Sequence, residues 1–574
     1  MARNQSSQNA EALFGKAMEA YENGDLSAAR KKIRRLQQSL PDEPAVWQLS
    51  AAIAIAQGKP AIAADFCRKG LARAGGSPAL RDLFGTALSE SGRPEEAAAE
   101  YRKSLELDPG NPGTLNNLGH ALMALRRFDE AVDVYRESLH HRAGHVDTLA
   151  GLAVAHDMAG DAVAAAAAYR HVIDLAPDHG EAWYGLAGLL SKSQRLDEAL
   201  DCYRKAVAID PENGSAKNGA ASVLLNLGRL DEAGDALDAA LAQLPDDPKV
   251  KVNQSVLNFY RGDWQQGWCD YESRWRLPGF PPRPFRQPQW AGQPLGGKTI
   301  LVWQEQGLGD EIMFASMIPE VRAIGGTVLV ECDARIEPLF SRSFPGIDCI
   351  ARNDPPDPRL AEADFQIAAG NLGRWLRRCE TEFPGGEAFL RADAERTAEL
   401  RARYAPERGD LLIGISWRSG GLEERRTKSM QLADLAPVLR VQGARFLSLQ
   451  YGDCQAERLD FQNAEGLDLI DDPTIDAMVD FDDHAAQVAA CDLVVSISTT
   501  TVHLAGSLGV PAWVMLEALP DRRWLLGRAD SPWYRSVSLN RQSERGNWST
   551  VVAKIAEDLP KFIENASSTG LVAP

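Results

Sequence analysis

The segment LNNLGHALMALRRFDEAVDVYRESL, residues 115–139, carries the pattern that decides the first half of the fold. Its apolar residues recur three or four apart on both sides of a short break at 126–129, which predicts two amphipathic helices joined by a tight turn. This pattern returns with a period of 34 residues. The small residues that share its most regular phase are Ala29, Ala63, Ala97, Ala131, Ala165, Ala199, Ala233 and Gly267.

The period predicts about eight helix pairs between residues 10 and 281, stacked into a solenoid with a concave binding surface. Glycines mark the turns in a second phase and prolines end the units in a third. The last pair departs from the others because it concentrates Trp264, Trp268, Tyr271 and Trp275. We interpret it as a capping repeat whose aromatic rings dock on the next domain, with a ligand-stacking platform as the alternative. Period and punctuation together resemble the tetratricopeptide repeat.

After a proline-rich linker at 282–296, short apolar runs alternate with helical stretches, which predicts parallel sheets. We expect one Rossmann-like half at 297–390 and a second at 411–546, separated by a segment at 391–410. A polar tail at 1–9, a C-terminal helix at 547–566 and a tail at 567–574 complete the predicted organisation. The expected strands are 299–303, 327–331, 365–368, 411–416, 445–449, 493–497 and 512–515.

Composition limits the classes of function. The chain has 574 residues and a formal net charge of −18, which argues against a general nucleic-acid binder. Its eight cysteines lack any CxxC pair, so neither a disulfide framework nor a metal site is expected. The polar start carries no signal core, and no apolar run is long enough to span a bilayer. We therefore expect a cytoplasmic protein without membrane insertion.

Three elements carry candidate chemistry, and the first follows the strand at 299–303. The run WQEQGLGDEIMF, residues 303–314, combines a glycine turn with carboxylates where a helix begins. Asp310, with Glu305 as second choice, is the candidate general base. The alternatives are a helix-start residue that complements the dipole at Asp310 and a surface carboxylate at Glu305.

The second and third elements belong to the C-terminal half. Arg418, Arg425, Arg426 and Lys428 crowd a loop after a strand, which suits a diphosphate, although a solvated charge run is the alternative. Gln450 and Tyr451 follow another strand and are candidates for contact with a nucleotide base. The last element runs from a strand into a helix whose start is an expected anion site. Its donor-binding candidates are Ser498, Thr499, Thr500, Thr501 and His503.

In combination, these elements resemble bacterial tetratricopeptide-repeat proteins fused to a GT-B glycosyltransferase module, related to heptosyltransferases and to O-GlcNAc transferase. The runs that carry the likeness are EQGLGDEIMF (305–314), GISWRSGG (414–421), FLSLQYGD (446–453), CDLVVSISTTTVHLAGSLGVP (491–511) and RRWLLGRADSPWYRSV (522–537). The resemblance implies a nucleotide-sugar donor on the second half, an acceptor on the first half, and neither metal nor other cofactor.

Two departures from the related families bear on substrates. Ser498 stands where heptosyltransferases carry an acidic donor-site residue, which puts an ADP-heptose-like donor in doubt. O-GlcNAc transferase lines its repeats with asparagines at one repeat position. In this chain only Asn117 and Asn253 stand at that position, and they are the acceptor-binding candidates. The related bacterial group also includes flagellin glycosyltransferases.

The sequence thus predicts an all-α tetratricopeptide solenoid followed by two Rossmann-like domains of GT-B type. The expected function is sugar transfer, inverting or retaining, from a nucleotide sugar to a serine or threonine hydroxyl of a protein held by the array. Flagellin is one candidate acceptor. Two alternatives stand beside it: a non-catalytic adaptor with an inactive module, and a transferase acting on lipid or polysaccharide.

Overall fold

The computed structural model describes residues 2–74, 76–280, 283, 285–383, 385–407, 409–419 and 428–569. The chain forms two compact units, which divide between Ala220 and Ala221 within one helix. Among the described residues, none of the helices combines the length and apolar character that a membrane span requires.

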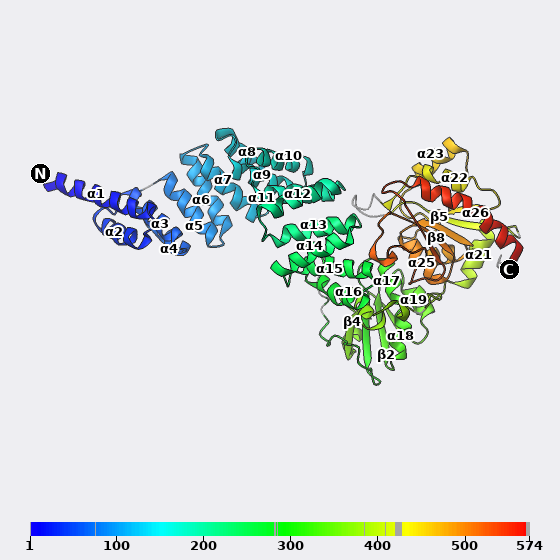
Figure 1. The fold of residues 1–574 in the computed structure, drawn as a ribbon. Coiled ribbons are helices and arrows are strands. Elements are labelled where there is room, and N and C mark those ends of the chain that lie inside the picture. Colours follow the sequence, from blue (N-terminus) through cyan, green and yellow to red (C-terminus); the bar gives the residue numbers. More distant parts are fainter. Residues whose placement is uncertain are drawn as a thin grey trace. The chain divides into compact units, whose positions relative to one another are not determined.

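Among the described residues, sixteen α-helices come first along the chain, and most of them pack against the next helix (Figure 1). They are α1 Ala2–Glu22, α2 Leu26–Ser39, α3 Pro44–Ala56, α4 Pro60–Ala74, α5 Pro78–Glu90, α6 Pro94–Leu107, α7 Pro112–Ala124, α8 Phe128–His141, α9 Val146–Ala159, α10 Ala162–Leu175, α11 Gly180–Lys192, α12 Leu196–Ile209, α13 Gly214–Asn226, α14 Leu230–Gln243, α15 Pro248–Arg261 and α16 Trp264–Tyr271. The predicted all-helical solenoid is confirmed, and α1 already begins within the segment predicted as a polar tail.

The 34-residue phases have direct steric causes. A Cβ atom on Gly119 would lie 2.4 Å from Cε1 of Tyr135, so the tyrosine of the second helix fills the space that the glycine of the first leaves open. The turn glycines adopt left-handed backbone, with φ of 65° at Gly58 and 88° at Gly160. Arg126 and Gln194 occupy the same phase with φ of 58° and 61°, although neither is glycine.

The second unit holds two parallel sheets. The first has the order β3-β2-β1-β4 and the second β6-β5-β7-β8-β9. The strands are β1 Thr299–Trp303, β2 Thr327–Cys332, β3 Asp348–Ala351, β4 Phe365–Ala368, β5 Leu412–Ser416, β6 Arg445–Ser448, β7 Leu493–Ile497, β8 Ala512–Leu516 and β9 Val537–Arg541. All seven predicted strands are present, and the sequence reading missed β3 and β9, which lie at sheet edges.

In the described part of this region, ten α-helices accompany the sheets: α17 Leu308–Ala315, α18 Ile318–Ala323, α19 Glu337–Ser343, α20 Gly373–Leu376, α21 Ala394–Tyr404, α22 Ala436–Leu439, α23 Gln455–Glu465, α24 Phe481–Ala489, α25 Thr500–Leu508 and α26 Ser549–Thr569. Helix α21 lies inside the segment predicted to separate the two halves. Helix α26 packs beside α22 on the second sheet (Figure 1). Strand order reverses between β1 and β4 and between β5 and β7, which is where open parallel sheets form ligand crevices.

The last repeat is part of this second unit. Trp268 on α16 donates from Nε1 to the carbonyl of Arg377 at 3.0 Å, and its ring fills the space above Gly373. The ring of Trp264 lies 4.8 Å from that of Phe383. These contacts confirm that the cap aromatics dock on the following domain.

Candidate functional site

Two helix starts meet at the carboxyl ends of the central strands. Helix α17 follows β1 after the loop 304–307, and α25 follows β7 after Ser498 and Thr499. A Cβ on Gly309 would lie 3.1 Å from Cδ2 of His503 and 3.6 Å from Oγ1 of Thr500, so glycine allows α17 to approach α25 closely. Neither start has a side-chain cap. Amide groups at both starts therefore point their partial positive charge toward the same region.

Basic side chains from the loop after β8 reach this region. Arg523 places Nη2 3.0 Å from Oδ1 of Asp310 and Nε 3.0 Å from Oδ1 of Asp521. Burial would raise the pKa of Asp521, but Arg523, Arg522 and Lys428 together hold it well below its usual range. The candidate general base, Asp310, therefore lies in one charge cluster with Lys428 and two arginines to which the sequence reading gave no role. We call Asp310, Asp521, Arg522, Arg523 and Lys428 the charge cluster.

Several buried polar atoms of the region lack a hydrogen-bond partner among the described residues. They include Oγ1 of Thr501, Oδ1 of Asp310 and Nε of Arg523, of which the last two make only the ion contacts given above. Thr501 is 1% exposed. Buried polar groups in folded proteins are normally satisfied, so these atoms retain hydrogen-bonding capacity for a ligand.

Three of the other donor-side candidates at α25, Ser498, Thr499 and His503, have protein contacts. Ser498 accepts a hydrogen bond from Nε1 of Trp524 at 2.7 Å, and Oγ1 of Thr499 lies 3.2 Å from Oγ of Ser496. His503 stacks on Trp524 and its Nδ1 lies 2.9 Å from Oη of Tyr534. Burial, reinforced by Arg523, lowers the pKa of His503 to about 3. A neutral imidazole fixed on both sides is suited to positioning α25 rather than to binding a phosphate.

Glu305 also has a different environment from the one predicted. Its carboxylate forms a buried ion pair with Arg274, with Nε of Arg274 2.9 Å from Oε2, and it accepts a hydrogen bond from the amide of Gly370 at 3.1 Å. The two side chains are 2% and 4% exposed. Removing a proton from an acceptor requires access to it, so this geometry favours an anchoring role between the last repeat and β1.

The loop after β5 contacts α23 and β6. Gln450 accepts hydrogen bonds from the amides of Trp417 and Arg418 at 3.0 and 2.8 Å. Its side chain therefore stabilises this loop and is not free to contact a nucleotide base. Arg418 donates to the carbonyl of Asp453 and lies 3.5 Å from Glu457. Tyr451 is half-buried beyond the end of β6. Arg425 and Arg426 lie outside the described residues.

The two acceptor candidates belong to different compact units. Asn117 lies on α7 and donates from Nδ2 to Oδ1 of Asp82 at 3.4 Å. Asn253 lies on α15 and is half-buried.

The last repeat also contacts the loop that carries Arg522 and Arg523. The guanidinium of Arg522 lies 4.6 Å from the ring centroid of Tyr271, and Gln306 donates to the hydroxyl of Tyr271. Tyr260 on α15 donates to the carbonyl of Pro520 at 2.7 Å. The loop that carries Asp521, Arg522 and Arg523 is therefore held by α15 and α16. The adjacent pair Arg522–Arg523 after a strand was the available sequence signal.

Comparison with known proteins agrees with the helical part. Two tetratricopeptide-repeat models match, one at residues 7–78 and the other at 88–155, 158–203 and 192–252. The helical array is built of tetratricopeptide repeats. A curated relative, protein FlbA of Caulobacter vibrioides, is 35% identical over 315 residues, which cover 52% of each chain. The chain thus spans about half the length of the curated relative it matches.

Solved structures with similarity to the chain are also known. YrrB, described as a TPR protein with an unusual peptide-binding site, is 22% identical, with 33% of this chain and 96% of that chain covered and a TM-score of 0.29. MamA of Desulfovibrio magneticus RS-1 is 20% identical, with 29% and 95% covered and a TM-score of 0.28. PilF of Pseudomonas aeruginosa is 18% identical, with 37% and 96% covered and a TM-score of 0.34.

Proposed function

We propose that the chain is a glycosyltransferase of GT-B type that transfers a sugar from a nucleotide-sugar donor to a hydroxyl of a protein bound by the repeat array. The observation that carries the proposal is the charge cluster beside the uncapped starts of α17 and α25. Tetratricopeptide repeats support the protein-binding part of this function. The two parallel sheets with reversed strand order support a nucleotide-binding part.

The charges of the cluster suit the departure of a nucleotide. When the bond between the anomeric carbon and the phosphate oxygen breaks, its electron pair goes to that oxygen. Arg523, Lys428 and the amides at the start of α25 would stabilise the developing negative charge, so these groups take the role that a metal ion has in other transferases. Oγ1 of Thr501 has free capacity to donate to a phosphate oxygen.

Asp310 is the proposed base. Its side chain is 13% exposed, and Arg523 pairs with it at 3.0 Å. The acceptor hydroxyl would give its proton to Asp310 while its oxygen bonds to the anomeric carbon. Phosphate binding to Arg523 would compete with Asp310 for the guanidinium and leave a carboxylate oxygen to accept this proton.

A transfer assay tests the proposal. The purified full chain is incubated with UDP-, GDP-, ADP- and CMP-linked sugars and with flagellin, the acceptor that the family resemblance suggests, and intact masses are recorded. We expect a mass increase of one sugar per modified site with one donor class. Asp310→Asn should retain nucleotide binding and lose at least a hundredfold in transfer rate, the contribution typical of general bases.

The adaptor alternative makes the opposite prediction. Under it, none of the donors shifts the melting temperature of the chain, and Asp310→Asn behaves like the wild type in every assay. A transfer that proceeds equally on a protein-free lipid or polysaccharide acceptor would instead assign the repeat array another task.

A further inference from the structure

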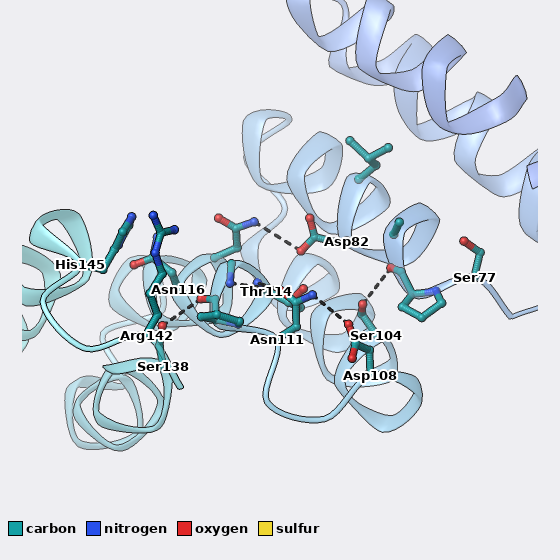
Figure 2. A pocket seen from close by; sticks show the side chains of 16 residues that line it. Ser77, Asp82, Ser104, Asp108, Asn111, Thr114, Asn116, Ser138, Arg142 and His145 are labelled. Carbon is teal, nitrogen blue, oxygen red and sulfur yellow. Dashed lines mark hydrogen bonds between the residues drawn. The ribbon is translucent and has the colours of Figure 1, made fainter. Parts of the chain in front are cut away.

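The first compact unit contains a polar cavity of about 610 Å³ between successive repeats (Figure 2). Its walls come from helices α5 to α8 and from the connections between α6 and α7 and between α8 and α9. Hydroxyl, amide and charged groups contribute most of the side chains that face it (Figure 2). Such a lining favours a polar or charged occupant over an apolar one.

Asp82 on α5 is the central charge of this cavity. Its carboxylate accepts a hydrogen bond from Nδ2 of Asn117 at 3.4 Å. Burial raises the pKa of Asp82, and hydrogen bonds from Thr114 and Asn117 offset only part of this effect. Among the described residues no cation pairs with Asp82. The neighbouring Arg81 has its own carboxylate partner, Glu100, at 2.9 Å.

The other acidic and basic side chains of the cavity lie in different parts of it. Asp108, after α6, accepts a hydrogen bond from Nδ2 of Asn111 at 2.8 Å. Arg142 and His145 belong to the connection between α8 and α9, and Figure 2 shows them away from Asp82 and Asp108. The end formed by α5 and by the segment after α6 therefore carries the negative charge, and it has room for a positive group of a ligand.

We propose that this cavity binds a lysine or arginine side chain of an extended segment of a partner protein, with the cationic group against Asp82. A carboxylate that is partly removed from water is unfavourable alone and becomes favourable when a cation and its hydrogen bonds arrive. The proposal rests on the protein-binding part of the proposed function and is independent of sugar transfer.

A peptide array tests this assignment. The labelled full chain is applied at about 0.15 M salt, where long-range surface attraction is screened, to random twelve-residue peptides. We expect the bound peptides to share one position enriched in lysine or arginine. One such peptide is then titrated into the wild type and into Asp82→Asn, which keeps the size of the side chain and removes its charge.

Asp82→Asn should bind that peptide at least tenfold more weakly, the loss expected for a charge-assisted hydrogen bond. Asp133→Asn, on an exposed position of α8 outside the cavity, is the matched control and should bind like the wild type. Replacing the basic residue of the peptide by norleucine should cause the same loss, with no further loss in Asp82→Asn. Equal melting curves establish that the variants are folded.

The assignment is overturned if no peptide binds, if bound peptides lack an enriched basic position, or if Asp82→Asn binds as tightly as the wild type. These outcomes concern peptide binding only. Failure of sugar transfer in the assay described above would leave the assignment standing, and loss of peptide selection would leave nucleotide binding unaffected.

Discussion

At the scale of single residues, the type of a side chain predicted where the residue lies in the fold better than it predicted what the residue does there. Asp310, Lys428 and Thr501 were identified from sequence, and the structure places each of them near the meeting point of α17 and α25. Glu305, Gln450 and His503 also follow strands of the two sheets but have protein partners. Such pairing depends on residues distant in sequence, such as Arg274 for Glu305, so the spacing of residues could not reveal it.

The carboxylate next to the proposed base makes stability depend on pH. Burial raises the pKa of Glu311 to about 7. The hydrogen bond from the amide of Asp333 and the positive charge of Arg352 lower this pKa, but they do not offset the effect of burial. Because the folded pKa exceeds the unfolded one, the associated stability is complete below about pH 4.5 and is lost as pH rises through about 7. Over that window the loss is on the order of 3 kcal/mol.

Glu311→Gln should therefore flatten the pH dependence of unfolding. Melting temperatures measured from pH 5 to pH 8 should fall more steeply for the wild type than for this variant. Glu362→Gln, at an exposed position, serves as the control and should follow the wild type. Parallel curves for Glu311→Gln and wild type would show that Glu311 is not the group responsible.

At the scale of elements, the sequence predicted helices and strands well because their patterns are local. The 34-residue period and the buried strands were visible without knowledge of contacts. Strands β3 and β9 escaped notice because polar residues, such as Asp348 and Asn540, interrupt their short apolar runs. Their recognition depends on the neighbouring strand rather than on their own composition.

The repeat turns allow a test of backbone strain. Arg126 holds φ of 58° at a position where most repeats carry glycine. Arg126→Gly should stabilise the array by about 0.5 to 1 kcal/mol, because relief of the left-handed strain exceeds the entropy that glycine adds to the unfolded chain. Thermal denaturation followed by circular dichroism measures the change. Arg126→Ala removes the side chain and keeps the strain, so a glycine variant no more stable than the alanine variant would refute this explanation.

The last repeat should affect ligand binding through the loop it holds. Tyr271→Phe keeps the ring beneath Arg522 and removes the hydroxyl that accepts from Gln306. We expect nucleotide affinity to fall severalfold while the melting temperature changes little, because one hydrogen bond contributes about 1 kcal/mol. Trp275→Phe, in the same repeat, provides a control with no contact to the charge cluster among the described residues. Unchanged affinity in Tyr271→Phe would limit the last repeat to docking.

At the scale of the whole molecule, the chain joins an array of tetratricopeptide repeats to a pair of parallel sheets. The compact units do not follow the predicted border at residue 281, because α14, α15 and α16 belong with the sheets. Aromatic contacts such as that between Trp264 and Phe383 explain this difference. Periodicity reports how helices stack on one another and carries no information about which neighbour buries the final apolar face.

The central claim, that the charge cluster binds the phosphate groups of a nucleotide, is tested most directly by calorimetric titration of UDP, GDP, ADP and CMP into the full chain. We predict that one of them binds the wild type and binds at least tenfold more weakly to Lys428→Ala and to Thr501→Val. Thr501→Val should melt at or above the wild-type temperature, because it removes a buried hydroxyl without a partner. Absence of binding by all four nucleotides, or equal affinity in both variants, would contradict the account.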